Sequence, residues 1–263
     1  MARNLYRRKV RSNEPDLPEV DISEEGNIRS LHLGSPTVQS SMDLDDPTRL
    51  VLSYSRSMMA WLLFLQNPKQ IVQIGLGGGS FTRWIDYYLP QTKDIVIEIN
   101  PQVIAVAKSF FELPFESERF EVVQADGAQY IKVFRKSVDV IMVDGFDGVQ
   151  IVDALVEEDF FQDCKKALSE QGIFITNWWS RDKRYAYFIE SLKSVFDGQV
   201  LEVPASSHGN IAVMAFKQSP ATIDLEKLKK TAQQLTEQYH IEFDAIFSAI
   251  KSHNQHNNKQ LIF

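Results

Sequence analysis

The stretch that decides the fold runs Lys69-Gln-Ile-Val-Gln-Ile-Gly-Leu-Gly-Gly-Gly-Ser-Phe81, and a second run follows it, Asp94-Ile-Val-Ile-Glu-Ile-Asn100. Each contains a short apolar segment typical of a buried strand, at 71–74 and at 95–97. The glycines after the first segment allow the backbone to turn sharply and to approach a ligand closely. The first amide groups of the helix expected from about residue 80 stay unpaired and face the same ligand.

An acidic residue at the end of the second apolar segment indicates the kind of ligand. Glu98 lies 23 residues after Gly75, and a doubly wound sheet places there the carboxylate that accepts the ribose hydroxyls of an adenosine. Glycine-rich turns alone are common, but the turn and the carboxylate together predict an adenosine site. The spacing differs from the phosphate-binding G-x-x-x-x-G-K-[ST] pattern, which argues against a nucleoside triphosphate.

Composition limits the classes of protein and partner. The chain has 263 residues, 44% of them hydrophobic and 24% charged, which is ordinary for a globular protein. A net charge of −7 argues against a nucleic-acid partner and suits a cationic ligand, although a charge that only maintains solubility explains it equally well. The single cysteine, Cys164, excludes an internal disulfide and a Cys-based zinc site, and we expect no metal. Without an apolar run of membrane-spanning length or a visible secretory signal, we expect no membrane contact and a cytoplasmic location.

From Lys69 onward, apolar segments alternate with segments of helical period. This alternation predicts crossover units and an α/β fold, a doubly wound, mostly parallel sheet of the Rossmann-like methyltransferase type. The expected strands are 70–75, 94–99, 119–124, 138–143, 172–177, 199–203 and 210–216, and the expected helices are 80–89, 101–111, 127–136, 156–169 and 182–196.

We expect three parts in the chain. Residues 1–47 are predicted to form an N-terminal element: a tail or an irregular edge strand over about 1–26, and then a small β-hairpin that turns at Gly34-Ser-Pro36. Residues 48–220 form the nucleoside-binding catalytic domain, beginning with a helix over about 48–66. Residues 221–263 form a helix over about 223–251 and a frayed polar tail.

Acidic residues follow three of the expected strands. Glu98, Asp126 and Asp144 each stand at the carboxyl end of a strand, the edge at which ligands of such sheets bind. We therefore expect the three side chains to gather on one rim. Asp126 has a second interpretation as the cap of the following helix, and the two interpretations are compatible.

These residues resemble the spermidine synthase family of aminopropyltransferases over about Leu31 to Lys217. Four blocks follow the family's order: Gly77-Gly-Gly79, Glu98-Ile-Asn100, Ala125-Asp-Gly127 and Asp144-Gly-Phe-Asp147. The segments 31–39 and 154–161 are similar to the family as well. The resemblance implies a substrate-facing Tyr54 and a donor site made of Gln39, Gly75, Gly77, Gly79, Ser80, Glu98, Ile99, Asp126 and Gly127.

The resemblance also implies the reaction. The donor would be decarboxylated S-adenosylmethionine, whose aminopropyl group passes to a small-molecule amine and leaves methylthioadenosine. An alkylammonium has a pKa near ~10.4 and must lose a proton before it attacks. Asp144 would take that proton as the general base, and Asp147 would hold the amine in line. A homodimer formed through the N-terminal β-element is implied by the resemblance alone.

Several positions depart from the family's pattern on the acceptor side. Ser80 replaces the aspartate that holds the donor's terminal amine, and Arg56 replaces a carboxylate. If Arg56 faced the pocket, it would repel an ammonium about 4 Å away by roughly 4 kcal/mol at an effective dielectric of ~20. The acceptor tyrosine motif reads Pro204-Ala-Ser206, and the end of the fifth strand reads Asn177-Trp-Trp179. We therefore expect a family member with a divergent acceptor site.

Other functions remain open at this point. A methyltransferase that uses intact S-adenosylmethionine is favoured by Ser80 and Arg56, because a donor carboxylate would accept hydrogen bonds from both. A non-catalytic nucleoside-binding paralogue is also possible, with Trp178 and Trp179 facing a partner. A nicotinamide dehydrogenase is disfavoured because Ser80 stands where its motif needs a glycine.

Overall fold

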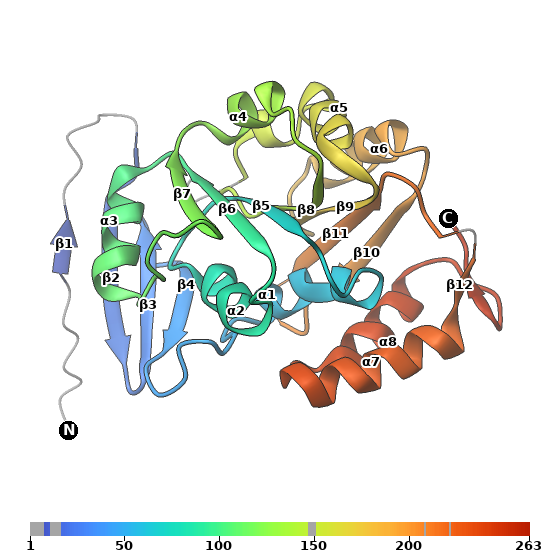
Figure 1. Ribbon diagram of the computed structural model, residues 1–263, viewed down its shortest axis with the longest axis horizontal. Coiled ribbons are helices and arrows are strands. Elements are labelled where there is room, and N and C mark those ends of the chain that lie inside the picture. Colours follow the sequence, from blue (N-terminus) through green and yellow to red (C-terminus); the bar gives the residue numbers. More distant parts are fainter. Residues whose placement is uncertain (1–7, 11–16, 147–150, 208, 221) are drawn as a thin grey trace.

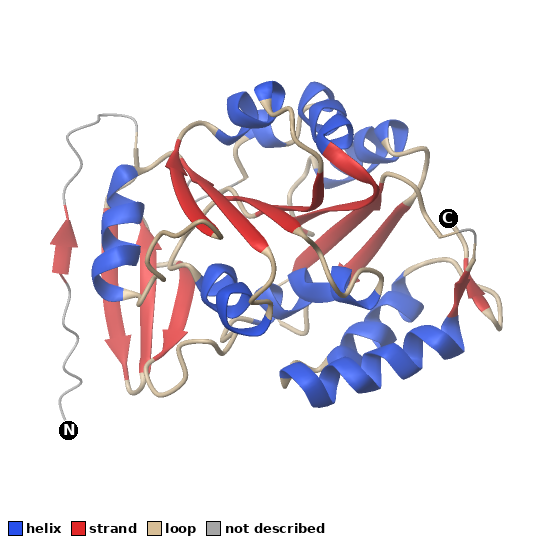
Figure 2. Cartoon of the chain, viewed as in Figure 1, coloured by secondary structure: helices blue, strands red, loops and turns tan. Residues whose placement is uncertain are grey.

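The computed structural model describes residues 8–10, 17–146, 151–207, 209–220 and 222–263 (Figures 1 and 2). Its centre is a seven-stranded sheet. The strands stand in the order β10 (Val200–Pro204), β11 (Asn210–Phe216), β9 (Leu168–Trp179), β8 (Val138–Val143), β5 (Gln70–Ile74), β6 (Lys93–Glu98) and β7 (Phe120–Gln124). Only β11 runs against its neighbours, so the predicted mostly parallel sheet is confirmed.

The strand order reverses beside β5. The chain proceeds from β5 to β6 and β7 on one side, and then crosses to β8 and β9 on the other. A crevice forms at the carboxyl ends of the strands where the order reverses, because the connections on its two sides lead away from each other. The predicted strand over 138–143 agrees with β8, and the other predicted strands agree to within a few residues apart from the early start of β9.

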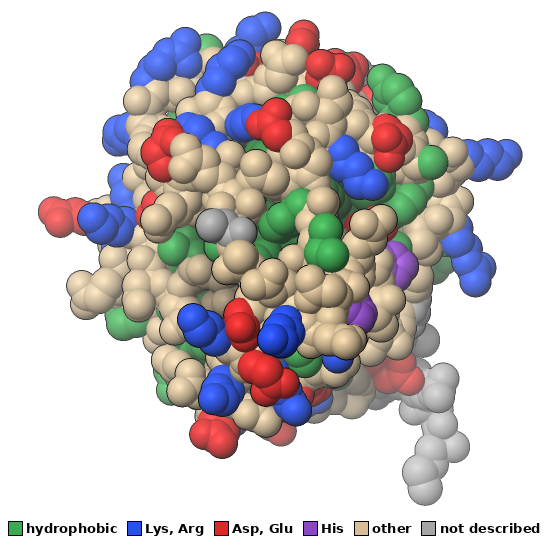
Figure 3. Space-filling view, turned by 90° about the vertical axis from the view of Figure 1, so that its right-hand side faces the viewer, with side chains coloured by type: hydrophobic (Ala, Val, Ile, Leu, Met, Phe, Trp, Pro, Cys, Tyr) green, Lys and Arg blue, Asp and Glu red, His purple; other side chains and the backbone are tan. Residues whose placement is uncertain are grey.

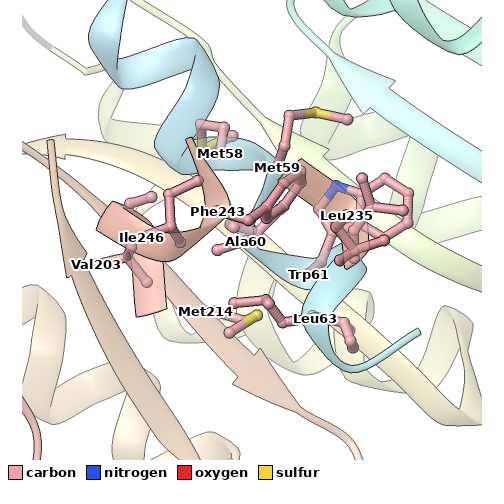
Figure 4. Packing of buried hydrophobic residues seen from close by; sticks show 14 of the residues in the cluster. Met58, Met59, Ala60, Trp61, Leu63, Val203, Met214, Leu235, Phe243 and Ile246 are labelled. Carbon is pink, nitrogen blue, oxygen red and sulfur yellow. The ribbon is translucent and has the colours of Figure 1, made fainter. Parts of the chain in front are cut away.

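Helices cover both faces of the sheet (Figure 1). One face carries α4 (Gly127–Val133), α5 (Glu158–Ala167) and α6 (Tyr185–Val195), and the other carries α2 (Ser80–Tyr88), α7 (Leu225–Tyr239) and α8 (Phe243–His253). Two separate apolar clusters form the corresponding cores. Figure 4 shows Met58, Trp61, Met214, Leu235 and Phe243 in the cluster beneath α7 and α8.

An antiparallel sheet precedes the central one. It contains β1 (Arg8–Val10), β2 (Val20–Glu25), β3 (Ile28–Leu33) and β4 (Val38–Asp43), in that order. The predicted hairpin corresponds to β3 and β4, and β2 lies in the segment that was expected to be a tail or an irregular edge strand. Val20 and Ile22 of β2 are buried in one cluster with residues of α3 (Pro101–Phe110), and this burial makes the acidic segment a strand.

The predicted helix over 48–66 is wrong. The structure has a short α1 (Ser53–Ser57) followed by the 3₁₀ helix η1 (Met58–Leu63), in which every residue is buried. Residues 50 and 51 are not helical, because their carbonyl oxygens accept hydrogen bonds from the Arg56 guanidinium at 2.8 and 2.7 Å. The side chain thus satisfies carbonyl groups that a helix would otherwise pair.

The C-terminal segment also differs from the prediction of one helix and a frayed tail. His240 takes a left-handed conformation, with φ of 55°, and ends α7, so that α8 can fold back. The last residues form β13 (Gln260–Leu261), which pairs with β12 (Ile223–Asp224). Among the described residues, no helix has the length and apolar character needed to cross a membrane. On the face seen in Figure 3, described basic and acidic side chains are interspersed.

Candidate active site

A cavity of about 480 Å³ lies at the carboxyl ends of β5, β6 and β8, at the reversal of strand order. Its volume is in the range of small-molecule sites. The N-terminal sheet closes one side of the cavity through Leu33 and Ser40. The predicted site residues that line it are Gln39, Tyr54, Gly75, Gly77, Ser80, Glu98, Ile99, Asp126, Gly127 and Asp144.

Two glycines serve the turn after β5 in different ways. Gly75 has φ of 96°, and a Cβ atom there would lie 2.3 Å from the carbonyl oxygen of Asp144. It therefore allows the ends of β5 and β8 to meet. Gly79 has φ of 73°, and a Cβ atom there would lie 2.6 Å from the side chain of Leu113. Unlike the other predicted donor residues, Gly79 does not line the cavity, because it faces Leu113 as the N-cap of α2.

Glu98 ties the end of β6 to this turn. Its carboxylate accepts the backbone amide hydrogens of Leu76 at 2.9 Å and of Asn100 at 2.8 Å. Burial raises the pKa of Glu98, and the hydrogen bonds from backbone amides act in the opposite direction. The carboxylate is thus held in place at the wall of the cavity, where it can accept hydrogen bonds from a ligand.

Asp126 combines both interpretations given to it. Its carboxylate accepts the backbone amide hydrogen of Gln129 at 3.0 Å, which makes it the N-cap of α4. The same residue lines the cavity next to Gly127. A Cβ atom at Gly127 would lie 2.3 Å from the side chain of Ile74, so this glycine allows α4 to pack against β5.

Asp144, at the end of β8, lies among hydrogen-bond donors. Asn177 of β9 donates from Nδ2 to Asp144 Oδ1 at 3.0 Å. Tyr54 of α1 lies within hydrogen-bonding reach of the same carboxylate, and its hydroxyl also donates to the carbonyl oxygen of Gln39 at 2.9 Å. Burial raises the pKa of Asp144, while Asn177 and Tyr54 counteract that rise. Burial, together with the nearby Asp144, raises the pKa of Tyr54 as well. A carboxyl group in such surroundings is suited to exchange a proton with a bound ligand.

Ser80 faces the cavity from the first turn of α2. Its hydroxyl donates to the carbonyl oxygen of Ser41 at 3.2 Å and lies 3.2 Å from the hydroxyl of Ser40. The buried guanidinium of Arg83 lies behind it, with Nη2 3.5 Å from Ser80 Oγ. Arg83 also donates to the carbonyl oxygens of Gly78, Phe111 and Pro47, and burial lowers its pKa to about 10. A neutral hydroxyl with a cation behind it therefore occupies this corner.

Arg56 would change the charge of the cavity only if it faced the cavity, and its position does not meet that condition. Besides its bonds to residues 50 and 51, its Nε lies 3.0 Å from Glu242, and it does not line the cavity. The guanidinium thus joins α1 to the start of α8. The repulsion of an ammonium expected from this side chain has no structural basis.

The remaining predicted positions lie in different surroundings. Asp147 lies outside the described residues. Trp178 is buried in the core, whereas Trp179 is 45% exposed. Near the Pro204-Ala-Ser206 segment, the neighbouring Ser207 hydroxyl lies 2.7 Å from that of Ser53. The contact of Asn177 with Asp144 was not predicted, because it depends on which strands are neighbours in the sheet.

The fold and the cavity together define a class of protein. A doubly wound sheet with a glycine turn, a carboxylate at the next strand end and a cavity at the reversal of strand order is the arrangement of a Rossmann-like, nucleoside-binding protein. The comparisons with known proteins give the particular family within this class.

The spermine/spermidine synthase domain family matches residues 52–227. A polyamine aminopropyltransferase of Neisseria meningitidis serogroup A is 63% identical over 260 residues, covering 98% of each chain. The chain therefore belongs to the spermidine synthase family of polyamine aminopropyltransferases, which are transferases.

Two solved structures share the fold. A probable spermidine synthase from Corynebacterium glutamicum has a TM-score of 0.73 at 17% identity, and the match covers 88% of this chain and 85% of that one. Human methyltransferase-like protein 13, solved in complex with SAH, has a TM-score of 0.66 at 27% identity, and the match covers 72% of this chain and 93% of that one. The same architecture therefore occurs in a protein named as a probable spermidine synthase and in one named as methyltransferase-like.

Proposed function

We propose that the protein transfers an aminopropyl group from decarboxylated S-adenosylmethionine to a small-molecule amine. The observation that carries this proposal is the position of Asp144, which lines one cavity with Glu98 and the glycine turn and is held by Asn177. A nucleoside binder without catalysis has no evident need for this buried, hydrogen-bonded carboxyl group. The names of the relatives support the same reaction class.

The donor occupies the part of the cavity between the glycine turn and α4. Glu98 accepts the ribose hydroxyls, as the carboxylate at this strand end does in doubly wound folds. Asp126 contacts the amino group of the base, and Ile99 and Gly127 lie against the nucleoside. Gln39 and Ser80 contact the donor from the side of the N-terminal sheet. All of these residues line the cavity.

The reaction is a displacement at the carbon beside the sulfonium. The amine nitrogen forms the new C–N bond, and the C–S bond breaks with its electron pair going to sulfur, which leaves neutral methylthioadenosine. The attacking nitrogen first gives a proton to Asp144, because an ammonium has no lone pair with which to attack. Tyr54 lies beside that carboxyl group and faces the reacting amine. Asp147, which lies outside the described residues, is proposed to hold the amine in line.

Orientation supplies much of the acceleration in this scheme. Holding two reactants in line contributes on the order of 7–11 kcal/mol to lowering a barrier. Carboxylates near the sulfonium bind the donor, but its positive charge disappears as the bond breaks. They therefore favour the ground state over the transition state and do not by themselves speed the step.

Release of methylthioadenosine tests the proposal directly. The purified protein is incubated with decarboxylated S-adenosylmethionine and, separately, with monoamines, diamines and longer polyamines, and the products are identified by mass spectrometry. We expect methylthioadenosine and an aminopropylated amine to appear in equal amounts with at least one acceptor. Absence of both products with every amine would contradict the proposal.

A second candidate, methyl transfer from intact S-adenosylmethionine, is favoured by one observation. Ser80, with Arg83 behind it, offers a hydroxyl and a positive charge to a donor carboxylate. The likeness to human methyltransferase-like protein 13 in complex with SAH supports this candidate as well. Calorimetric titration of the protein with both donors separates the two functions. Tighter binding of the carboxylated donor would favour methyl transfer, and tighter binding of the decarboxylated donor would favour aminopropyl transfer.

The assembly and location of the protein are proposed on the resemblance and the composition. We infer a homodimer formed through the N-terminal β-element, a cytoplasmic location and no nucleic-acid partner. Sedimentation equilibrium tests the first of these: a mass near 60 kDa, about twice the 30.1 kDa of the chain, is expected. A monomeric mass at micromolar concentration would contradict it.

A further inference from the structure

Three side chains on the neighbouring strands β11, β9 and β8 are joined by hydrogen bonds in a continuous line. Asn210, the first residue of β11, donates from Nδ2 to Asn177 Oδ1 at 3.0 Å. Asn177, on β9, donates in turn from Nδ2 to Asp144 Oδ1 at 3.0 Å. Asn177 is only 3% exposed, so water has little access to its two ends. The line therefore runs from the start of β11, outside the lining of the cavity, to the proposed base, which lines it.

The direction of this line follows from the chemistry of a carboxamide. One end of an asparagine side chain only accepts hydrogen bonds and the other only donates them. The Asn177 oxygen accepts the hydrogen bond from Asn210, and its NH₂ group is thereby directed to Asp144, which can only accept. The opposite orientation would place the Asn177 oxygen against the carboxylate and leave an NH₂ group opposite that of Asn210. Both contacts would then be repulsive.

The other described groups around Asp144 do not replace this donor. Tyr54 of α1 has a single hydroxyl hydrogen, and the carbonyl oxygen of Gln39 competes for it at 2.9 Å. The remaining titratable groups that line the cavity are all acidic: Glu98 of β6, Asp126 before α4 and Asp153 of η2 (Asp153–Leu155), the last paired with Arg184. The hydrogen that Asn177 donates is thus committed to Asp144, whereas that of Tyr54 is shared.

We propose that Asn210 is a positioning residue, which turns the Asn177 carboxamide so that its NH₂ group, and not its oxygen, faces Asp144. This deepens the proposed function, because it rests on Asp144 being the base that accepts the amine proton. A donated hydrogen bond favours the ionised carboxylate over the neutral acid. Asn210 thereby keeps the base in its proton-accepting form without touching the substrate or the reacting atoms.

The isosteric substitution Asn210→Asp tests this relay. A carboxylate at this position cannot donate to the Asn177 oxygen and repels it, so Asn177 can no longer keep both contacts and its hydrogen bond to Asp144 is weakened or reversed. The pKa of Asp144 is read by ¹³C NMR of carboxyl-labelled aspartates, with its resonance assigned from its loss in Asp144→Asn. We expect Asn210→Asp to raise this pKa by about one unit, as loss of a hydrogen bond to a charged group implies. Asn210→Ala removes the donor and leaves the Asn177 carboxamide less firmly held, so its hydrogen bond to Asp144 should be weakened less and the pKa should rise by a smaller amount.

A matched control separates reversal of the carboxamide from the added charge. Ser180 is exposed and lies at the same end of the sheet, where its amide donates to the carbonyl oxygen of Gly209 at 2.9 Å. Ser180→Asp therefore adds a carboxylate near Asn210 and leaves the Asn177 contacts in place. A rise of the pKa of Asp144 in Asn210→Asp without such a rise in Ser180→Asp supports the proposal. Equal rises in both variants, or none in Asn210→Asp, overturn it. If Asn210→Asp does not fold, Asn210→Ala decides by the same titration: a rise supports the relay, and an unchanged pKa overturns it.

The NMR titration of Asp144 tests the role of Asn210 independently of the proposed function. If the wild-type protein turns over amines, the acid limb of the pH profile of kcat/KM should move upward in Asn210→Asp together with the NMR titration. If the wild-type protein turns over none, the aminopropyl transfer is refuted. The NMR comparison of Asn210→Asp with Ser180→Asp still decides whether Asn210 sets the orientation of Asn177.

Discussion

The carboxylate of Glu98 accepts the backbone amide hydrogen of Leu76 at 2.9 Å, so the end of β6 is joined directly to the turn that follows β5. The same side chain accepts the amide hydrogen of Asn100 at 2.8 Å. One carboxylate therefore serves two purposes: it stabilises the turn, and it presents its remaining acceptor capacity to the cavity. The first prediction separates these purposes.

Glu98→Gln should weaken nucleoside binding by about tenfold or more, because a carboxamide accepts fewer hydrogen bonds than a carboxylate and its NH₂ group faces donors. The affinity is measured by calorimetry with methylthioadenosine, the proposed product. Glu121→Gln is the matched control, since Glu121 on neighbouring β7 is a partly exposed carboxylate paired with Lys93. Equal affinities of Glu98→Gln and the wild-type protein would remove Glu98 from the donor site.

Asp144→Asn should abolish turnover and leave methylthioadenosine affinity largely unchanged, because it removes the proposed base but keeps the shape of the side chain. In the wild-type protein, the rate should rise with pH through the pKa of Asp144, which burial places above that of an ordinary aspartate. Initial rates across the pH range check the turnover and its pH dependence, and calorimetry checks the methylthioadenosine affinity. Asp159→Asn, an exposed position on α5, is the control and should behave as the wild-type protein. A fully active Asp144→Asn variant would show that the base is another group.

Arg56→Ala should lower the free energy of unfolding by about 1–2 kcal/mol and leave the KM for donor and amine unchanged. Its guanidinium bonds two backbone carbonyl oxygens and Glu242, all of which stand outside the lining of the cavity. Urea unfolding and steady-state kinetics measure the two quantities. A change in KM at unchanged stability would mean that Arg56 reaches the substrates after all.

Asp94 predicts a dependence of stability on pH that is unrelated to catalysis. Burial raises its pKa to about 7, although both carboxylate oxygens accept hydrogen bonds from Gln73 Nε2 at 2.8 and 2.7 Å. The folded protein therefore holds a proton that the unfolded chain releases above about pH 4. Between about pH 4 and pH 7 the free energy of unfolding should fall as pH rises, by on the order of 4 kcal/mol from this group.

The substitution Asp94→Asn should remove that contribution, since a carboxamide does not ionise and can still accept a hydrogen bond from Gln73. Compared with the wild-type protein, the variant should gain stability as pH rises from 5 to 8, as urea unfolding at each pH will show. Asp163→Asn, at a partly buried position on α5 where the carboxylate pairs with Lys166, is the control and should leave the pH dependence as it is. If the difference between Asp94→Asn and the wild-type protein is the same at both pH values, Asp94 does not carry a raised pKa.

The sequence alone determined the central sheet and most of the residues that line the cavity on the side proposed for the donor. The alternation of apolar and helical segments is a local property, and Gly75 and Glu98 follow strands whose direction it dictates. The gathering of Glu98, Asp126 and Asp144 on one rim follows from the rule that parallel strands end at a common edge, and the cavity contains all three. Where contacts are local or set by topology, sequence reasoning is sufficient.

Only the tertiary structure decided the partners of Arg56, Asn177 and Asn210. The sequence left open whether Arg56 faces the cavity. It pairs with Glu242, 186 positions away, because α8 folds back and brings that carboxylate to α1. The left-handed conformation of His240 lets α8 fold back, and the sequence has no glycine at this position that would have indicated it. Asn177 and Asn210 meet because β11 runs antiparallel beside β9, a pairing that no local pattern encodes. The sequence gives the type of each side chain. Which residues it contacts depends on the packing that buries the most apolar surface while satisfying the polar groups.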